Sequence, residues 1–403
     1  MTDPDLVVVG SGPAGIAAAL RARGDDARVV LVERGLIGGT CVHAGCVPSE
    51  AYHASAGFVR DLRRAASAGV DAGSTAVLDW GRAQVWASRA SDTVSAAVRQ
   101  QLRHANVTIE EREAGVGPSG ADGYPGVPVV VATGARPAPV DGASSAEAIM
   151  GLPRVPDIVH VLGGERFSLE WADFFAAAGS RVTVVVPDGE VLSGDDPELV
   201  EFLRGALAER GVRFAAGRPE EPADVVVSAD EREPSIPGLS VDALCRTSFE
   251  HVWAAGDVTG PRWLSNRARA QGAAAAANAL GGTVRVREER LPRSVNTDPE
   301  LAAVGLTERE AADRGIEAAV GIADCGTNAY AIARGRAEGA LKVLVDTEYG
   351  EILGAHMVGP GAREVIGQVA TAMTLEADYR ELRRVAHIHP SLAELVTDAL
   401  AAI

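Results

Sequence analysis

Two cysteines five positions apart are the residues of this sequence best suited to redox chemistry. Cys41 and Cys46 belong to the run GGTCVHAGCVPS at positions 38–49, and we expect both in the first turns of a helix that continues through positions 51–55. A helix N-terminus stabilises a thiolate, the reactive form of cysteine. Cysteines so close together can also form a strained local disulfide. The pair could therefore take up an electron pair from a thiol and pass it on.

Metal binding is the alternative use of such a pair. It is disfavoured because no second Cys/His pair stands at the spacing of zinc ligands, so we expect no metal. His43, between the two cysteines, is expected to pack or to form a hydrogen bond. Cys245 and Cys325 lie far from the pair and from each other, which predicts two buried thiols. Four cysteines are also too few for the disulfide framework of a secreted protein.

A dinucleotide-binding fingerprint precedes the cysteine pair. The apolar positions 6–9 predict a buried strand, and GSGPAG at 10–15 then opens an alanine-rich helix over 16–23. A second strand is expected at 29–32, and it ends in Glu33. This order of strand, glycine turn, helix, strand and acid is the full GxGxxG context.

Each part of the fingerprint has a physical role in holding a nucleotide. Gly10 permits the tight turn, and Gly12 lets the backbone approach a pyrophosphate. Gly15 allows the helix to pack closely on the strand. The helix N-terminus offers amides and partial positive charge to the phosphates. Glu33 can accept hydrogen bonds from a ribose.

Three further motifs follow in order. The triplet ATG at 132–134 comes after an expected strand at 129–131, VWAAGDV stands at 252–258, and HIHPSLAE stands at 387–394. Together with 38–49, these motifs resemble the flavoprotein disulfide reductase family, which includes dihydrolipoamide dehydrogenase, glutathione reductase and mercuric reductase. The resemblance covers nearly the whole chain.

The resemblance implies FAD as cofactor and a role for each catalytic residue. Cys41 would attack the substrate, and Cys46 would face the flavin as a thiolate. His389, reaching across from the other subunit of a homodimer, would be the acid–base partner of Cys41, with Glu394 orienting it. From the residues alone His389 could equally be a core histidine, although a nucleophilic thiol does need an oriented base. The residues expected at the cofactor are Gly10, Gly12, Pro13, Ala14, Gly15, Glu33, Arg34, Gly39, Thr40, Glu50, Thr133, Gly134, Glu170, Gly256 and Asp257.

Length and pattern predict an α/β protein of several domains. We expect two Rossmann-like nucleotide-binding units and a C-terminal α+β dimerisation domain. The flavin domain would comprise residues 1–150 and 236–285. A shortened NAD(P)-binding-like domain would comprise 151–235, and the dimerisation domain 286–403. The further elements expected are a long amphipathic helix at 79–103, a loop at 115–128, strands at 158–162, 181–186, 341–345 and 351–358, and helices at 168–178, 197–210 and 362–375.

The second nucleotide-binding turn departs from the family pattern. It reads GGERFS at 163–168, so Glu165 stands where a glycine would let the backbone meet a pyrophosphate. A carboxylate 4 Å from a phosphate costs roughly 4 kcal/mol at an effective dielectric near 20, on the order of a thousandfold in affinity. The following strand ends in the apolar VVVP at 184–187, and the usual GRxPN-like exit is replaced at 228–234. NAD(P)H use is therefore doubtful, although binding by another local geometry stays open.

Glu50 is a second departure, because the family has a lysine there, beside the flavin and paired with a glutamate that matches Glu170. Two carboxylates without a cation would force one pKa upward. Arg166 replaces the family's aromatic gate, and we hypothesise that it turns inward to pair with Glu50 and Glu170. Ser391 replaces a threonine, which we expect to be neutral.

Composition narrows the partners. The net charge of −17 argues against nucleic acid and anionic membrane surfaces. No segment is long and apolar enough to span a bilayer, and the acidic N-terminus is unlike a signal peptide, so we expect a cytoplasmic protein.

The sequence thus predicts an FAD-dependent dithiol–disulfide oxidoreductase. It would act on a small thiol or disulfide, with NAD(P)H use lost or weakened, as a thiol oxidase or in a specialised biosynthetic reaction. A conventional NAD(P)H-dependent disulfide reductase and a non-catalytic flavoprotein are the alternatives.

Overall fold

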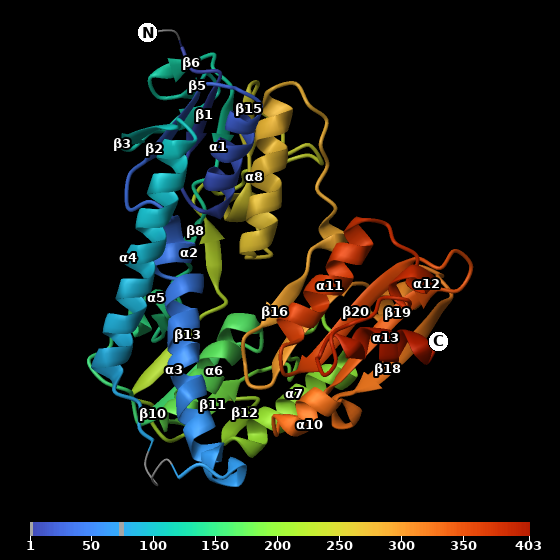
Figure 1. Ribbon diagram of the computed structural model, residues 1–403. Coiled ribbons are helices and arrows are strands. Elements are labelled where there is room, and N and C mark those ends of the chain that lie inside the picture. The colour runs from blue at the N-terminus through green and yellow to red at the C-terminus, as the bar shows by residue number, and fades with distance from the viewer. Residues whose placement is uncertain (1–2, 72–75) are drawn as a thin grey trace.

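The computed structural model describes residues 3–71 and 76–403, which build three units (Figure 1). Two α/β units lie one above the other in this view, and the third, in orange and red, lies at their right. The N-terminus is at the top of the upper unit, and the C-terminus lies at the outer side of the third. The predicted fold class, two Rossmann-like units with an α+β unit, is confirmed.

A parallel sheet forms the centre of the upper unit, with strand order β15-β7-β1-β2-β3. The strands are β1 (Leu6–Val9), β2 (Val29–Glu33), β3 (Thr108–Glu111), β7 (Val129–Val131) and β15 (Val252–Ala254). Its central strands are continuous apolar runs because both faces are covered. On one face, α1 (Pro13–Gly24) and α8 (Ser265–Ala279) approach so closely that a Cβ on Gly272 would lie 2.1 Å from the carbonyl oxygen of Ala14.

The other face of this sheet carries a small antiparallel sheet. Its strands are β4 (Val116–Gly117), β5 (Gly120–Ala121) and β6 (Tyr124–Pro125). The prediction of a loop at 115–128 is therefore wrong, because the glycines there form hairpin turns rather than an irregular segment. Ala121 is buried in the same apolar cluster as Val7 and Val131.

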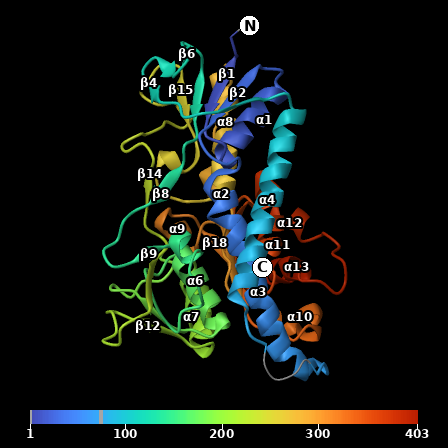
Figure 2. The same cartoon turned by 90° about the vertical axis from the view of Figure 1, so that its left-hand side faces the viewer.

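Two long helices run beside each other along the upper and lower units (Figures 1 and 2). They are α3 (Cys46–Arg64) and α4 (Trp80–His104), and α4 confirms the helix predicted at 79–103. Asp79 begins α4 by accepting a hydrogen bond from the amide of Arg82. Neither these nor the other helices of the described part of the chain are long and apolar enough to cross a membrane.

The lower unit holds the second parallel sheet, with strand order β12-β11-β10-β13-β9. The strands are β9 (Ser144–Ser145), β10 (Ile158–Leu162), β11 (Arg181–Val185), β12 (Val212–Ala215) and β13 (Val225–Ser228). The helices are α5 (Ala146–Ile149), α6 (Arg166–Ala178) and α7 (Pro197–Glu209). A two-stranded ribbon of β8 (Ala135–Pro137) and β14 (Arg232–Pro234), not foreseen from the sequence, connects to the upper unit.

The third unit is an antiparallel sheet in the order β16-β17-β20-β19-β18. Its strands are β16 (Arg293–Val295), β17 (Glu300–Gly305), β18 (Ala318–Asp324), β19 (Ala340–Asp346) and β20 (Ile352–Gly359). Its helices are α9 (Glu308–Asp313), α10 (Ala329–Ala333), α11 (Ala362–Thr374), α12 (Tyr379–Leu382) and α13 (Glu394–Ala401). β20 is buried throughout because α11 and α13 contribute to the same apolar cluster.

Buried ion pairs fix the third unit to the others. Arg60, on α3, forms ion pairs with Asp298 at 3.2 Å and with Asp173 of α6 at 2.9 Å. Lys342, the only lysine of the chain, pairs with Asp196 at the start of α7 at 3.2 Å. These contacts hold the residues between the units in place.

Candidate active site

The cysteine pair lies where α2 (Gly39–His43) meets α3. Cys41 is in α2 and Cys46 is the first residue of α3, so the prediction of one continuous helix is wrong. The chain breaks at Gly45, where a Cβ would lie 3.1 Å from the carbonyl oxygen of Thr40. His43 contacts the carbonyl oxygen of Ile37 through Nε2 at 2.9 Å, which confirms a hydrogen-bonding residue.

The two thiols share a hydroxyl that sequence reasoning missed. The Oγ of Ser265 lies 3.0 Å from the Sγ of Cys46 and 3.4 Å from the Sγ of Cys41. Ser265 begins α8, 219 positions from Cys46, and no sequence signal near the cysteines points to it. Both cysteines are free thiols here.

The surroundings give the two thiols opposite acidities. A hydrogen bond from Cys41 lowers the pKa of Cys46 to about 6, against the effect of burial and with help from Ser265. The same bond, together with burial, raises the pKa of Cys41. The position of Cys46 at the N-terminus of a 19-residue helix also favours a negative charge. In the reduced pair, Cys46 is therefore the thiolate and Cys41 the thiol.

The first glycine turn is an open cradle beside this pair. Gly10 has φ +100°, and a Cβ there would lie 2.4 Å from the carbonyl oxygen of Ala132. A Cβ on Gly15 would lie 1.8 Å from the carbonyl oxygen of Gly10, whereas a Cβ on Gly12 would meet nothing within 4 Å. The helix begins with Pro13, which has no N–H, followed by Ala14, whose amide is free of a side-chain bond from the N-cap residue Gly12. These open amides fit the pyrophosphate of FAD.

The acid that we predicted to bind a ribose lies at the carboxyl end of β2. Glu33 accepts hydrogen bonds at 2.7 Å from the amide and hydroxyl of Ser11 and from the amide of Gly35. Arg34 instead pairs with Glu113 at 3.1 Å on the exposed surface. The structure therefore places Glu33 at the cradle and turns Arg34 outward.

The remaining predicted cofactor residues lie around the same sheet edge. Gly39 approaches the cradle, since a Cβ on it would lie 3.0 Å from the Cα of Gly12. Thr133 accepts a hydrogen bond from Ser235 at 2.8 Å. The residues set near them by backbone position are Thr40 in α2, Gly134 with φ +74°, Gly256 and Asp257.

Asp257 is the second residue of a turn, Gly256–Thr259, at the carboxyl end of β15. Burial raises its pKa. The preceding amide, that of Gly256, donates to the side chain of Gln271 at 2.8 Å. Gln271 is buried in α8 and was not foreseen from the sequence.

Glu50 has a cation partner, but a different one from the one predicted. The guanidinium of Arg363, in the first turn of α11, lies 3.0 Å from Glu50 and 3.3 Å from Glu300. The predicted ion pairs of Arg166 with Glu50 and Glu170 are wrong within the described residues. Glu50 pairs with Arg363 instead, and Arg166 acts on Glu170 only through its charge, which favours the ionised carboxylate. Arg166 lies instead over the ring of Phe167, 5.5 Å from its centroid.

Asn296 connects the two carboxylates near the cysteines. Its side-chain amide donates to Glu50 at 2.9 Å, and its backbone amide donates to Glu170 at 2.9 Å. Burial raises the pKa of Glu170 to about 7, which Asn296 and Arg166 only partly offset. One carboxyl group does titrate upward as predicted, with burial as the main cause.

His389 and Glu394 form a hydrogen-bonded pair at the start of α13. The Nδ1 of His389 lies 2.9 Å from one carboxylate oxygen of Glu394, and the other oxygen accepts the amide of Ser391 at 2.9 Å. These contacts, with that of Ser391 the larger, lower the pKa of Glu394. The pair is not brought to Cys41 within one chain, since α13 and α2 lie apart in both views (Figures 1 and 2).

The second glycine turn is covered by the chain that follows β11. A Cβ on Gly164 would lie 2.6 Å from the carbonyl oxygen of Glu190. The amide of Leu192 donates to the carbonyl of Gly164 at 3.1 Å. Glu165 is the N-cap residue of α6 and its carboxylate is reached by the hydroxyl of Ser193 at 3.4 Å.

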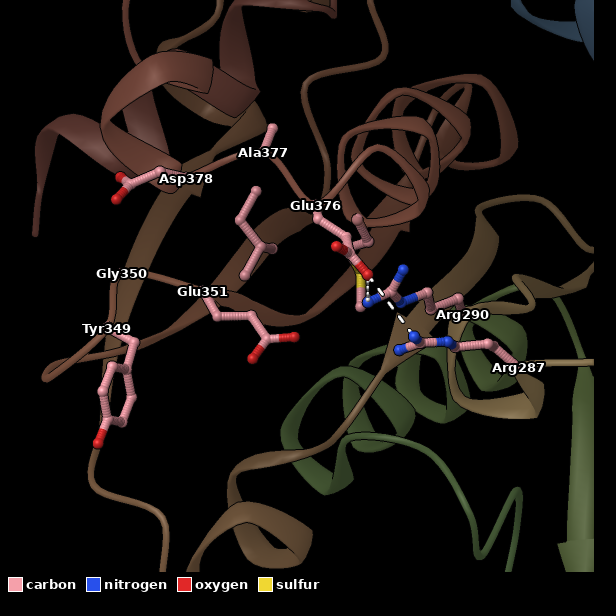
Figure 3. A pocket seen from close by; sticks show the side chains of 10 residues that line it. Arg287, Arg290, Tyr349, Gly350, Glu351, Glu376, Ala377 and Asp378 are labelled. Atoms are coloured by element: carbon pink, nitrogen blue, oxygen red, sulfur yellow. Dashed lines mark hydrogen bonds and ion pairs between the residues drawn. The ribbon is translucent and has the colours of Figure 1, made fainter. Parts of the chain in front are cut away.

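A separate pocket of about 390 Å³ lies in the third unit (Figure 3). Glu376 on its wall pairs with Arg290 at 3.0 Å and Arg287 at 3.7 Å. The predicted site residues do not line it, so it is not part of the cysteine site.

Comparison with known proteins defines the class. The model of the pyridine nucleotide-disulphide oxidoreductase family matches residues 4–223, and that of its dimerisation domain matches residues 291–400. The chain therefore belongs to the pyridine nucleotide-disulphide oxidoreductase family, a family of FAD-binding enzymes that act on sulfur groups. This agrees with the open cradle around Gly12.

Individual relatives match over their full length. Dihydrolipoyl dehydrogenase 2 of Haloarcula marismortui is 31% identical, with 100% of this chain and 97% of the relative covered. A dihydrolipoyl dehydrogenase of Bacillus subtilis is 29% identical, with 98% and 97% covered. The crystal structure of LpdA from Mycobacterium tuberculosis has a TM-score of 0.90 and 27% identity, covering 98% of this chain and 99% of that one.

Proposed function

We propose that this flavoprotein oxidises a small dithiol at Cys41 and Cys46 and no longer uses NAD(P)H efficiently. The observation that carries the proposal is the polarised thiol pair, in which the pKa of Cys46 is lowered and that of Cys41 is raised. A disulfide between unlike thiols is opened at one sulfur, because the better leaving group is the one with the lower pKa.

The reaction then has a defined order. A substrate thiolate attacks the Sγ of Cys41 in the oxidised pair, and Cys46 leaves as a thiolate. The second substrate thiol attacks the mixed disulfide, so that the substrate departs as a disulfide and Cys41 keeps the electrons as a thiol. The first glycine turn around Gly12 would hold FAD, whose chemistry would be to accept the electron pair released when the Cys41–Cys46 disulfide forms again, with oxygen or another acceptor as the final oxidant.

The chain's own residues support the other steps. Cys41 needs a base that removes the substrate proton, and His389 is hydrogen-bonded to Glu394 as such a base requires. Because His389 is exposed and lies apart from Cys41 in its own chain, we place it in the site of the partner subunit of a homodimer. Two buried free cysteines suit a reducing compartment, so we place the protein in the cytoplasm.

Weakened NAD(P)H use is the part of the proposal that departs from the family. It is supported by Glu165 at the start of α6 and by the carbonyl of Glu190 over Gly164. The alternative is a conventional NAD(P)H-dependent reductase, which the full-length similarity to dihydrolipoyl dehydrogenases favours. A non-catalytic flavoprotein is disfavoured because it would not need the polarised thiols and the His389–Glu394 pair together.

The substitution Cys46→Ser tests the thiol chemistry. It should abolish oxidation of dithiothreitol by the holoenzyme, because the disulfide that the substrate thiolate attacks cannot form without the Sγ of Cys46. FAD content should stay at the wild-type level. Cys245→Ser, which removes a buried thiol outside the pair, is the matched control. Turnover by Cys46→Ser at the wild-type rate contradicts the proposed role of the pair.

A further inference from the structure

The N-terminus of α6 already holds an anion, and the anion belongs to the protein. Asp230, two residues after β13 ends, accepts hydrogen bonds on Oδ1 from the amides of Phe167 at 2.9 Å and Ser168 at 3.3 Å. These are first-turn amides of the 13-residue helix that follows the second glycine turn. Such amides, free of partners within the helix, are the ones that bind phosphate in dinucleotide sites.

The other oxygen of Asp230 points into the glycine turn itself. A Cβ on Gly163 would lie 3.1 Å from Oδ2 of Asp230. Oδ2 of Asp230 is buried and has no hydrogen-bond partner within the described residues. The nearby hydroxyl of Ser168 donates its hydrogen bond to the carbonyl of Leu162 at 3.0 Å. The carboxylate therefore occupies the space between the turn and the helix.

The first glycine turn shows the same elements without such an occupant. There, the N-cap residue of α1 is Gly12, which has no side chain, and within the described residues the place of a Cβ on Gly12 is open for at least 4 Å. The two turns are alike in the strand, the positive φ of the first glycine (+100° at Gly10, +103° at Gly163) and the helix. They differ in which amides a carboxylate binds: Asp230 binds first-turn amides of the helix in the second turn, with Glu165 at its rim, whereas in the first turn Glu33 binds the amide of Ser11, which precedes the helix.

We propose that Asp230 is an internal substitute for the dinucleotide pyrophosphate, and so the residue that decides against NAD(P)H. This inference rests on the weakened NAD(P)H use proposed above and names its main cause. To bind here, a pyrophosphate would have to displace the carboxylate of Asp230 from the amides of Phe167 and Ser168. Its negative charge would also come close to the charges of Asp230 and Glu165, which repel it. The second nucleotide-binding unit thus keeps its sheet and helices, while the place where a pyrophosphate would bind is occupied.

The test is equilibrium binding of NAD⁺ and NADP⁺ to the oxidised holoenzyme by titration calorimetry. The variants are Asp230→Asn, which removes the charge, and Asp230→Ala, which also removes the volume. We expect the neutral variant to bind at least about tenfold more tightly than the wild type, a change of about 1.4 kcal/mol. Asp230→Ala combined with Glu165→Gly should bind more tightly still.

Asp224→Asn is the matched control. Asp224 lies just before the opposite end of β13 and likewise accepts two backbone amides, those of Asp157 at 2.9 Å and Ile158 at 3.0 Å. The Asp224→Asn variant should bind NAD⁺ and NADP⁺ as the wild type does. FAD absorbance and the melting temperature of every variant show whether it is folded.

Each outcome separates this inference from the proposed function. Tighter binding of NAD⁺ or NADP⁺ by the Asp230 variants, with no change in Asp224→Asn, supports the inference. Folded variants that bind no better than the wild type overturn it, whereas oxidation of dithiothreitol by the wild type would still support the proposed thiol chemistry. Tight binding of NAD⁺ or NADP⁺ by the wild type overturns both the inference and the proposed weakening of NAD(P)H use.

Discussion

At the cysteine pair, one serine hydroxyl faces two sulfurs but has a single proton to donate. Ser265 lies nearer to Cys46, at 3.0 Å, than to Cys41, at 3.4 Å. When Cys46 is ionised, the hydroxyl proton of Ser265 and the thiol proton of Cys41 both point to the Sγ of Cys46. Hydrogen bonds to the charged form of a group favour that form, so the negative charge stays on Cys46.

The acidity of Cys46 gives a pH dependence with a defined sign. Its pKa lies at about 6, below the ordinary thiol value, so the thiolate is present at neutral pH and is lost as the pH falls through 6. The long-wavelength thiolate–flavin absorbance of the reduced pair should follow that titration. Ser265→Ala should move the midpoint upward by about one unit, since a hydrogen bond to the charged form is lost.

Ser55→Ala is the control for this titration, because Ser55 lies on α3 and donates to the carbonyl of Ala51, away from the sulfurs. A midpoint for Ser265→Ala at or below that of the wild type would show that the hydroxyl does not stabilise the thiolate.

Some site residues could be predicted from the sequence and others could not. Cys41, Cys46 and the glycines of the first turn lie in short motifs whose spacing has a local physical meaning. Ser265, Asn296 and Arg363 reach the site only through tertiary contacts, and their neighbours in the chain have no motif. The error over Arg166 has the same origin, since the cation beside Glu50 comes from a helix 313 positions away.

At the scale of elements, apolar runs of three to five residues predicted the parallel strands well. β1, β7 and β10 begin and end at the predicted residues because buried parallel strands are mostly apolar segments, interrupted among these three only by the buried His160 of β10. The longer strands β17 and β18 of the third unit were not predicted either. The other failures are short elements set by turns: the β4–β6 sheet, the β8–β14 ribbon and the break between α2 and α3. Their strands of two or three residues are too short to show a period.

The junction of α3 and α11 should behave as a coupled unit. Glu50→Gln and Arg363→Gln each remove one partner of a half-exposed ion pair, so each should cost at most about 1 kcal/mol of unfolding free energy. The double variant should cost less than the sum of the two by about 0.5 kcal/mol. Urea unfolding of the holoenzyme measures all three.

The exposed pair Arg154–Asp157 provides the control cycle, for which we expect no measurable coupling. Additive effects at Glu50 and Arg363 would mean that Asn296 and Glu300 satisfy the two groups without the ion pair.

At the scale of the whole molecule, we propose that two chains contribute to each site. Cys41→Ser and His389→Ala homodimers should both lose dithiol oxidation. A heterodimer of the two variants has one site with an intact Cys41 from one chain and an intact His389 from the other. It should therefore recover about half of the wild-type turnover per dimer, because the two sites act independently.

Co-expression with two different affinity tags isolates this heterodimer, and the turnover of dithiothreitol reports the result. The double variant carrying both changes on one chain, paired with wild type, is the control. No recovery in the first heterodimer would place His389 and Cys41 of the same chain in one site.

The most direct test of the account is anaerobic stopped-flow mixing of the oxidised holoenzyme with dithiothreitol, NADH and NADPH in separate experiments. The flavin absorbance and the long-wavelength thiolate–flavin band would be followed together. We predict that dithiothreitol reduces the enzyme within seconds while neither nicotinamide does so over the same time. Rapid bleaching by NADH or NADPH would contradict the account and identify a conventional reductase.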